Sequence, residues 1–253
     1  MIPTHPSLSN ANSFRDLPRW LWLWVPVIYI IAHVVVSGFG QEIYDRYLAG
    51  GELGTNELLT MGMLFVAVFI GLNTLWLMRG MSDWRLWLWV FLGTLGCVYF
   101  GGEEASWGQH LIGWESSEAW QQFNDQQETN LHNSDKYGPL LDQLPRNLLT
   151  LGMLVGGVFA VMWRKIKNLS LDPAGIHYWI WPTFICLPAG ILGVTVSWPE
   201  AIYSSITGIE RPERFNLTSG ELKEWYIAFF LMIYLTSFNL RFRQLRAAKA
   251  AEN

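Results

Sequence analysis

Long apolar runs separated by short polar segments form the dominant pattern of this chain. Each of six runs is long enough, or nearly so, to cross about 30 Å of hydrocarbon at about 1.5 Å per residue. The runs cover residues 20–39, 58–78, 86–102, 148–163, 178–198 and 225–240. They do not alternate as barrel strands do, and lipid tolerates no unpaired backbone groups. We therefore predict an all-α integral membrane bundle of six transmembrane helices, forming one domain over residues 1–253. The fourth and sixth runs are short, so their helices should extend into the interface.

Composition supports the membrane interpretation. Hydrophobic residues make up 51% of the chain and charged residues only 15%, with 15 Trp. The net charge of −4 gives no reason to expect a nucleic-acid partner. Cys97 and Cys186 both fall inside apolar runs and are too few for a disulfide framework, so we interpret them as small core residues. The polar first 19 residues and the lack of a small-residue cleavage site indicate that the first run is an uncleaved span.

Lys and Arg residues collect in one set of the segments between the runs. If the chain starts on the cytoplasmic side, the inner segments hold eleven of the 17 Lys and Arg residues but only four of the 21 Asp and Glu residues. The inner segments then carry a net charge of +7 and the outer segments −11. The positive-inside rule therefore predicts that both termini are cytoplasmic.

The chain also shows signs of an internal repeat. LLTMGML at 58–64 recurs as LLTLGML at 148–154. The run that follows each copy has a Trp-x-Trp entry, a central Cys and a Ser-Trp exit. We interpret this as three parallel two-helix hairpins, although a Trp-rich membrane protein can repeat such short motifs through composition alone.

The longest connection, residues 103–147, carries most of the candidate chemistry. It is rich in aromatic residues and too long for a plain linker, so this outer loop should contain an interfacial or re-entrant helix. Glu103 and Glu104 follow Gly101-Gly102 at the outer end of the third run. A carboxylate at mid-bilayer costs about 2.5–3.5 kcal/mol and less near the interface, so at least one of the two should face protein or trapped water.

Histidine and carboxylate residues also recur at helical spacing in this connection. A continued third helix would place Glu103, Trp107 and His110 on one face, and Glu128 and His132 would share a face if that segment is helical. Imidazole and carboxylate groups could form an acid–base pair, or could bind a divalent metal such as zinc, iron or manganese.

Three overlapping sets of candidate site residues follow. The catalytic candidates are Glu103, Glu104, Glu128 and His132. The candidate ligands of a divalent metal are Glu104, His110, Glu128 and His132. The candidate substrate-binding residues, which could hold a polar head group or orient ligands, are Ser106, Trp107, Gln109, Asn130 and Asn133.

The same residues also have structural interpretations. Asp125-x-x-Glu128 fits a capping box, His132 can be an ordinary surface histidine, and Glu104 can pair with an arginine such as Arg146. No established metal signature such as HExxH is present, so the metal hypothesis rests on residue types alone. In this interpretation, the polar residues of the long loop form a network that holds the loop against the bundle.

Three polar residues inside the apolar runs have separate interpretations. His33 lies in the middle of the first run, where an intramembrane histidine suggests a role in protonation. As a neutral side chain bonded to a neighbouring helix, His33 would be structural instead. Asn73 and Asn239 lie near the inner ends of their helices, where we expect interhelical or carbonyl hydrogen bonds.

The motifs EExSWGQ, from Glu103 to Gln109, and QETNLHN, from Gln127 to Asn133, together resemble a pattern found in an uncharacterised family of bacterial multi-pass inner-membrane proteins. The resemblance covers about 33 of the 253 residues. It implies a bacterial inner membrane and a shared polar site, and it carries over no mechanism. Arginine is common in that family at the position of His110, which weakens His110 as a metal ligand.

Three functions agree with these patterns. The first is an integral-membrane enzyme or binding protein whose periplasmic site handles a membrane lipid or lipid-linked substrate. The second is a non-catalytic subunit or assembly factor that grips another membrane protein through the Trp-rich loop. The third is a proton- or cation-coupled transporter, which receives less support because the inner halves of the spans offer few polar residues.

Overall fold

The computed structural model describes residues 16–49, 54–81, 83–118, 129–130, 139–209 and 216–251, and this part of the chain is helical or irregular, without strands. Six helical segments are long and apolar enough to cross a membrane, which confirms the predicted six-helix multi-pass architecture. They cover Trp20–Gly38, Thr55–Leu77, Trp84–Glu104, Leu144–Lys167, Ile176–Thr207 and Ser219–Ala248. The fourth and sixth segments extend beyond the apolar runs at both ends, as expected from their short apolar cores.

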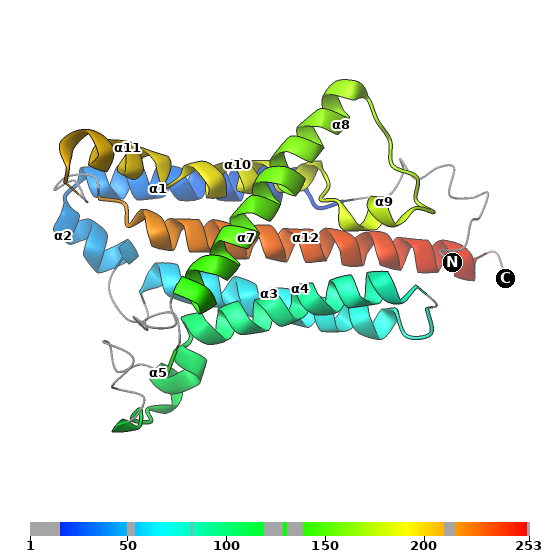
Figure 1. The fold of residues 1–253 in the computed structure, drawn as a ribbon, viewed down its shortest axis with the longest axis horizontal. Helices are drawn as coiled ribbons and strands as arrows, with labels where there is room; N and C mark the ends of the chain where they lie inside the picture. Colours follow the sequence, from blue (N-terminus) through cyan, green and yellow to red (C-terminus); the bar gives the residue numbers. More distant parts are fainter. Residues whose placement is uncertain are drawn as a thin grey trace.

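The individual elements follow one another in simple order, and the label η marks short π-helical or 3-10-helical segments. The first three spans and the connections after them comprise η2 (Trp20–Trp24), α1 (Val25–Gly38), α2 (Gln41–Tyr44), η3 (Asp45–Ala49), α3 (Thr55–Leu77), α4 (Trp84–Glu104), η4 (Ser106–Gly108) and α5 (Gln109–Ile112). The last three spans comprise η5 (Pro139–Gln143), α7 (Leu144–Gly152), η6 (Met153–Ala160), α8 (Val161–Lys167), α9 (Ile176–Ile180), η7 (Phe184–Cys186), α10 (Leu187–Thr195), α11 (Trp198–Thr207) and α12 (Ser219–Ala250). We call the end of the bundle that carries α2, α5 and α11 the outer end, following the orientation predicted from charge (Figure 1).

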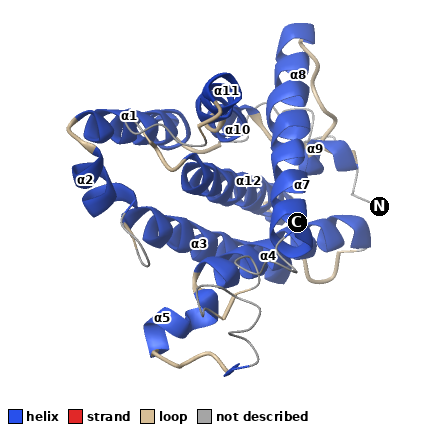
Figure 2. Cartoon of the chain, turned by 60° about the vertical axis from the view of Figure 1, so that its left-hand side comes forward, coloured by secondary structure: helices blue, strands red, loops and turns tan. Residues whose placement is uncertain are grey.

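The sixth span is the central helix of the bundle. In its most apolar stretch 78% of the residues are buried, against 22–33% in the other five spans. α3 and α4 pack on one side of α12 and α10 packs on the other, next to α1. The continuous rod of α7, η6 and α8 crosses α12 obliquely (Figures 1 and 2). The other spans expose large apolar side chains such as Phe69 and Trp76, which suits helices that face hydrocarbon.

Close packing and a few polar bonds join the spans. α3 approaches α4 so closely at Gly71 that a methyl group there would overlap the Thr94 side chain. The Asn239 amide donates to Asn73 Oδ1 at 3.0 Å and to Thr74 Oγ1 at 2.8 Å, which confirms the predicted interhelical role of the two asparagines. Cys97 and Cys186 are both buried with free thiols, as expected for small core residues. The hairpin repeat stays a prediction.

The fifth span is broken in its inner half. α9 ends at Ile180, and Trp181 has an extended backbone (ψ 133°) before Pro182. Proline has no N–H and disfavours the helical conformation of the preceding residue. Side chains replace the lost helical partners, because the Tyr234 hydroxyl donates to the Ile180 carbonyl at 2.7 Å and Arg164 donates to the Pro182 carbonyl. The break is therefore a stable part of the fold.

The segment before the first span is tied to this break. Asp16 accepts hydrogen bonds from Thr183 at 2.9 Å and from Ser237 at 3.1 Å. Arg241, one turn further along α12, is buried and donates to the Tyr178 carbonyl at 2.7 Å. The inner half of the bundle is thus joined by polar bonds from three different parts of the chain.

Candidate functional site

The outer end of α4 forms the first part of the candidate site. The helix ends at Glu104, and Ser106, Trp107 and Gly108 all have positive φ angles of 43°, 54° and 97°. This turn folds the Trp107 ring back against Gly102, where a Cβ atom would lie 2.8 Å from the ring. Trp107 Nε1 then donates to Glu103 Oε1 at 2.8 Å. Glu103 is only 3% exposed, so one of the two adjacent carboxylates faces protein, as predicted.

The second sequence motif meets the first at this turn. The buried Asn130 amide donates to Ser106 Oγ at 3.0 Å. The backbone N–H and the hydroxyl of Thr129 both donate to Gln109 Oε1 at 2.5 Å. Three of the predicted substrate-binding residues, Ser106, Gln109 and Asn130, therefore take part in the bonds that hold Thr129 and Asn130 against the end of α4. These contacts support the interpretation of a structural polar network for this part of the motif.

A cavity of about 250 Å³ that includes charged residues in its lining lies beside the end of α4. Glu103 and Glu104 line it from α4, and Arg146 lines it from α7. The full lining is Gly96, Tyr99, Phe100, Glu103, Glu104, Leu141, Pro145, Arg146, Leu149 and Ile227. We call this space the outer cavity.

An ion pair borders the outer cavity. Arg146 Nη1 lies 2.6 Å from Glu224 Oε1, and the two side chains are 24% and 14% exposed. The pair joins α7 to the start of α12, next to the two carboxylates of α4. The Tyr99 hydroxyl completes the frame by donating to the Leu141 carbonyl at 2.7 Å. The residues that line the cavity thus include both carboxylate and guanidinium side chains.

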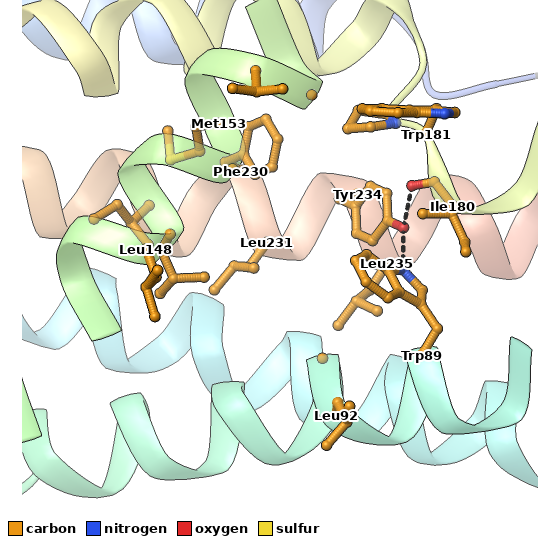
Figure 3. Close-up of a pocket in the computed structure, with 17 residues that line it drawn as sticks. Trp89, Leu92, Leu148, Met153, Ile180, Trp181, Phe230, Leu231, Tyr234 and Leu235 are labelled. Atoms are coloured by element: carbon orange, nitrogen blue, oxygen red, sulfur yellow. Dashed lines mark hydrogen bonds between the residues drawn. The ribbon is translucent and has the colours of Figure 1, made fainter. Parts of the chain in front are cut away.

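A larger and almost entirely apolar cavity of about 410 Å³ continues toward the middle of the bundle (Figure 3). Leu149 and Ile227 line both this cavity and the outer cavity, so the two spaces share a wall. Its floor is α12, and its sides are α4 and the rod of α7 and η6. Leu92 and Leu148 on its rim are about half exposed, so the space is open toward the lipid side. We call it the apolar groove.

Aromatic side chains line the inner end of the apolar groove. Trp89 Nε1 donates to the Tyr234 hydroxyl at 2.6 Å, and that hydroxyl donates to the Ile180 carbonyl (Figure 3). Trp181 and Pro182, at the break in the fifth span, line the same end. α4, α12 and the fifth span therefore meet at one hydrogen-bonded wall.

Several predicted site residues lie outside the described part of the chain. They are Glu128, His132 and Asn133, together with the side chain of His110. Within the described residues, no group of three His, Cys, Asp or Glu side chains could hold a metal ion. Of the four candidate metal ligands, only Glu104 has a described side chain, and the metal hypothesis gains no support. α4 does not continue from Glu103 through Trp107 to His110, because it ends at Glu104 and three positive φ angles follow, so the helical face that a continued helix would give is not formed.

The surroundings of His33 favour a structural role for this side chain. It is buried, and its Nδ1 lies 2.9 Å from the hydroxyl of Tyr44, which itself donates to the Leu217 carbonyl at 2.7 Å. The single hydroxyl hydrogen goes to the carbonyl, so Nδ1 of the neutral imidazole is the donor. No described carboxylate bonds to His33. This arrangement favours the neutral structural interpretation, and a role in protonation stays a prediction.

Sequence reasoning missed the residues that connect the polar and apolar spaces. Glu224 directly precedes the sixth apolar run, the same kind of position that drew attention to Glu103, and this signal could have identified it. Leu149 and Ile227 are ordinary apolar residues within their spans, and no sequence signal separates them from lipid-facing neighbours. Comparison of the chain with protein-family models, curated proteins and solved structures gives no match.

Proposed function

We propose that the protein binds a membrane lipid or lipid-linked compound, with the polar head in the outer cavity and the hydrocarbon chain in the apolar groove. One observation carries this proposal: the outer cavity, whose lining includes Glu103, Glu104 and Arg146, and the apolar groove share Leu149 and Ile227 as a common wall. Ligand sites combine a mostly apolar lining with a few well-placed polar groups, and this pair of spaces has that composition. The order of polarity along the helices matches that of a lipid in one leaflet.

The outer cavity favours a head group that carries both charge signs or many hydrogen-bond donors. Glu103 and Glu104 can accept from ammonium or hydroxyl groups, and Arg146 can donate to phosphate oxygens. A zwitterionic phospholipid such as phosphatidylethanolamine fits this combination better than a purely anionic lipid. The charge-based orientation and the family resemblance together support a bacterial inner membrane, with the site at the periplasmic face.

The same site offers a starting point for catalysis. Glu103 and Glu104 are the described carboxylates at the polar end, and a carboxylate beside a bound head group can act as a general base. In this proposal Glu128 and His132 would complete the catalytic set from the long loop. Transport of protons or cations is less well supported, because the apolar groove provides no polar path from the outer cavity toward the inner end.

A second candidate function rests on exposed aromatic side chains at the outer end. Trp107 and Trp114, both within the connection of residues 103–147, are 47% and 36% exposed. Trp is enriched in protein interfaces, so this surface could bind another membrane protein. Purification of the full chain with a stoichiometric partner, lost on replacement of Trp114 by Ala, would support this function.

Native mass spectrometry of the purified protein tests the lipid proposal. Gly152 lines the apolar groove, and a Cβ atom added there meets no atom within 4 Å. Gly152→Leu should therefore place its side chain in the groove and fill part of it, and should gain helix propensity of about 1 kcal/mol. The matched control is Gly62→Leu, the same change in the same motif on α3, also in open space.

The expected result is a bound phospholipid on the wild type and on the Gly62→Leu variant, and at least a tenfold loss of it on Gly152→Leu. Phosphatidylethanolamine should be retained in preference to phosphatidylglycerol, and Glu104→Gln should reduce that preference. Equal lipid retention by Gly152→Leu and Gly62→Leu would show that the groove is not the binding site.

A further inference from the structure

We infer that the apolar groove selects bound lipids by the length of their hydrocarbon chain, and that the wall of Trp89, Tyr234 and Ile180 sets the longest chain accepted. This inference rests on the proposed lipid site and adds the chain class to it. The ligand would be a lipid with one extended chain that fits the part of one leaflet spanned by the groove. Trp89 and Tyr234 would be specificity-determining residues rather than catalytic ones.

The length of the groove follows from the helix that forms its floor. On α12, Ile227 lines the end that the groove shares with the outer cavity, and Leu235 lines the inner end. These positions are separated by eight residues, or about 12 Å at about 1.5 Å per residue. One leaflet provides half of the hydrocarbon thickness, about 15 Å. A chain that fills the groove therefore stays within one leaflet, and its end meets the wall of Trp89 and Tyr234.

The wall at the inner end is held in place from three directions. The indole of Trp89 on α4 bonds to the Tyr234 hydroxyl on α12 at 2.6 Å. That hydroxyl bonds to the Ile180 carbonyl at 2.7 Å, an acceptor freed by the break before Pro182. An aromatic wall fixed by two successive hydrogen bonds resists displacement by a flexible chain, whereas a single apolar side chain could change rotamer.

Packing against this wall would set the preference among chains. A lipid chain arrives from hydrocarbon rather than from water, so its entry gains little from the hydrophobic effect. Dispersion contacts with the groove walls then decide the affinity, and these are lost wherever a short chain leaves an empty space. Retention should therefore rise with chain length until the chain end meets Trp89, and then fall.

Two substitutions should move this limit in opposite directions. Trp89→Ala removes the wall and should extend the limit to longer chains. Gly93→Leu should shorten it, because Gly93 lines the groove one turn outward of Trp89 and has only Leu235 near its added side chain, at 3.8 Å. The matched control is Trp87→Ala, which removes an indole from the same helix but not from the groove lining.

The test is competition among lysophosphatidylethanolamines of graded length, from octanoyl to hexadecanoyl, read by native mass spectrometry on each full-length variant. We expect one preferred length for the wild type and for Trp87→Ala, a longer one for Trp89→Ala and a shorter one for Gly93→Leu. If either groove variant fails to fold, the other still tests the direction of the shift.

The same preferred length in every variant that binds lipid would overturn the chain-length inference and leave the proposed lipid site intact. A wild-type protein that retains none of these lipids, and no phospholipid after purification, would overturn both. A shift that occurs equally in Trp87→Ala would also overturn the inference, because that residue does not line the groove.

Discussion

The ion pair between Arg146 and Glu224 should couple the fourth and sixth spans by a measurable free energy. The charged atoms lie 2.6 Å apart, and the side chains are 24% and 14% exposed. Water screens such a pair only weakly, and hydrogen bonds to charged groups contribute about 1.5–3 kcal/mol. We expect a coupling energy of about 2 kcal/mol between Arg146→Gln and Glu224→Gln, or about a thirtyfold change in the folding equilibrium.

A double-mutant cycle measures this energy. The wild type, the two single variants and the double variant would be unfolded in mixed micelles with increasing sodium dodecyl sulfate, with helix content followed by circular dichroism. Each substitution should lower the free energy of unfolding more in the wild type than in the protein whose partner residue is already replaced. A matched control is the exposed pair of Arg46 and Glu42, at 3.6 Å with side chains 67% and 89% exposed, where about 0.3–0.5 kcal/mol is expected.

Equal coupling in the two cycles would refute the reasoning. It would mean that water screens Arg146 and Glu224 as effectively as a surface pair, despite their burial. The polar end of the proposed lipid site would then lack the rigid frame that this pair provides.

Three further predictions concern the fold around the site. Gly71→Ala should lower the free energy of unfolding by about 1–3 kcal/mol because the new methyl group overlaps Thr94. Adding Thr94→Ala should restore part of this stability. Gly62→Ala, in open space, should cause no loss of stability. Asn239→Ala should cost about 0.6–1.7 kcal/mol in the same unfolding assay, because two interhelical bonds disappear; a loss within error would contradict their role. Burial raises the pKa of Tyr44 from 10.0 to about 12. The protonated form thus favours the folded state, and this stability is present below pH 10 and is lost as the pH rises toward 12; tyrosinate absorbance compared with Tyr44→Phe would show it, and a transition near pH 10 would contradict it.

The six spans could be predicted from the sequence because lipid imposes a strong and local constraint. An apolar run of sufficient length has few alternatives to a transmembrane helix. The break in the fifth span was less predictable, since membrane helices tolerate proline when neighbours satisfy the freed backbone groups. Here the neighbours are Arg164 and Tyr234, which are far from Pro182 in the sequence.

The candidate site was predictable only in part for a similar reason. The motif residues Ser106 and Gln109 do meet Asn130 and Thr129, so the two motifs lie side by side. The apolar groove depends on how α4 and the oblique rod of α7 and η6 pass over α12. That crossing follows from close contacts such as Gly157 against Phe230, which a hydropathy pattern does not encode.

The central position of α12 has a consequence for how the protein is made in the membrane. This helix leaves the ribosome after the other five spans, yet α3 and α10 both pack on it, and Ser237 supplies one of the bonds that fix Asp16. The five earlier spans therefore enter the lipid before their common partner is present, and the final arrangement can form only after the sixth span has been inserted. Biogenesis of this bundle ends with its core, whereas a soluble domain of similar size can collapse around its core during synthesis.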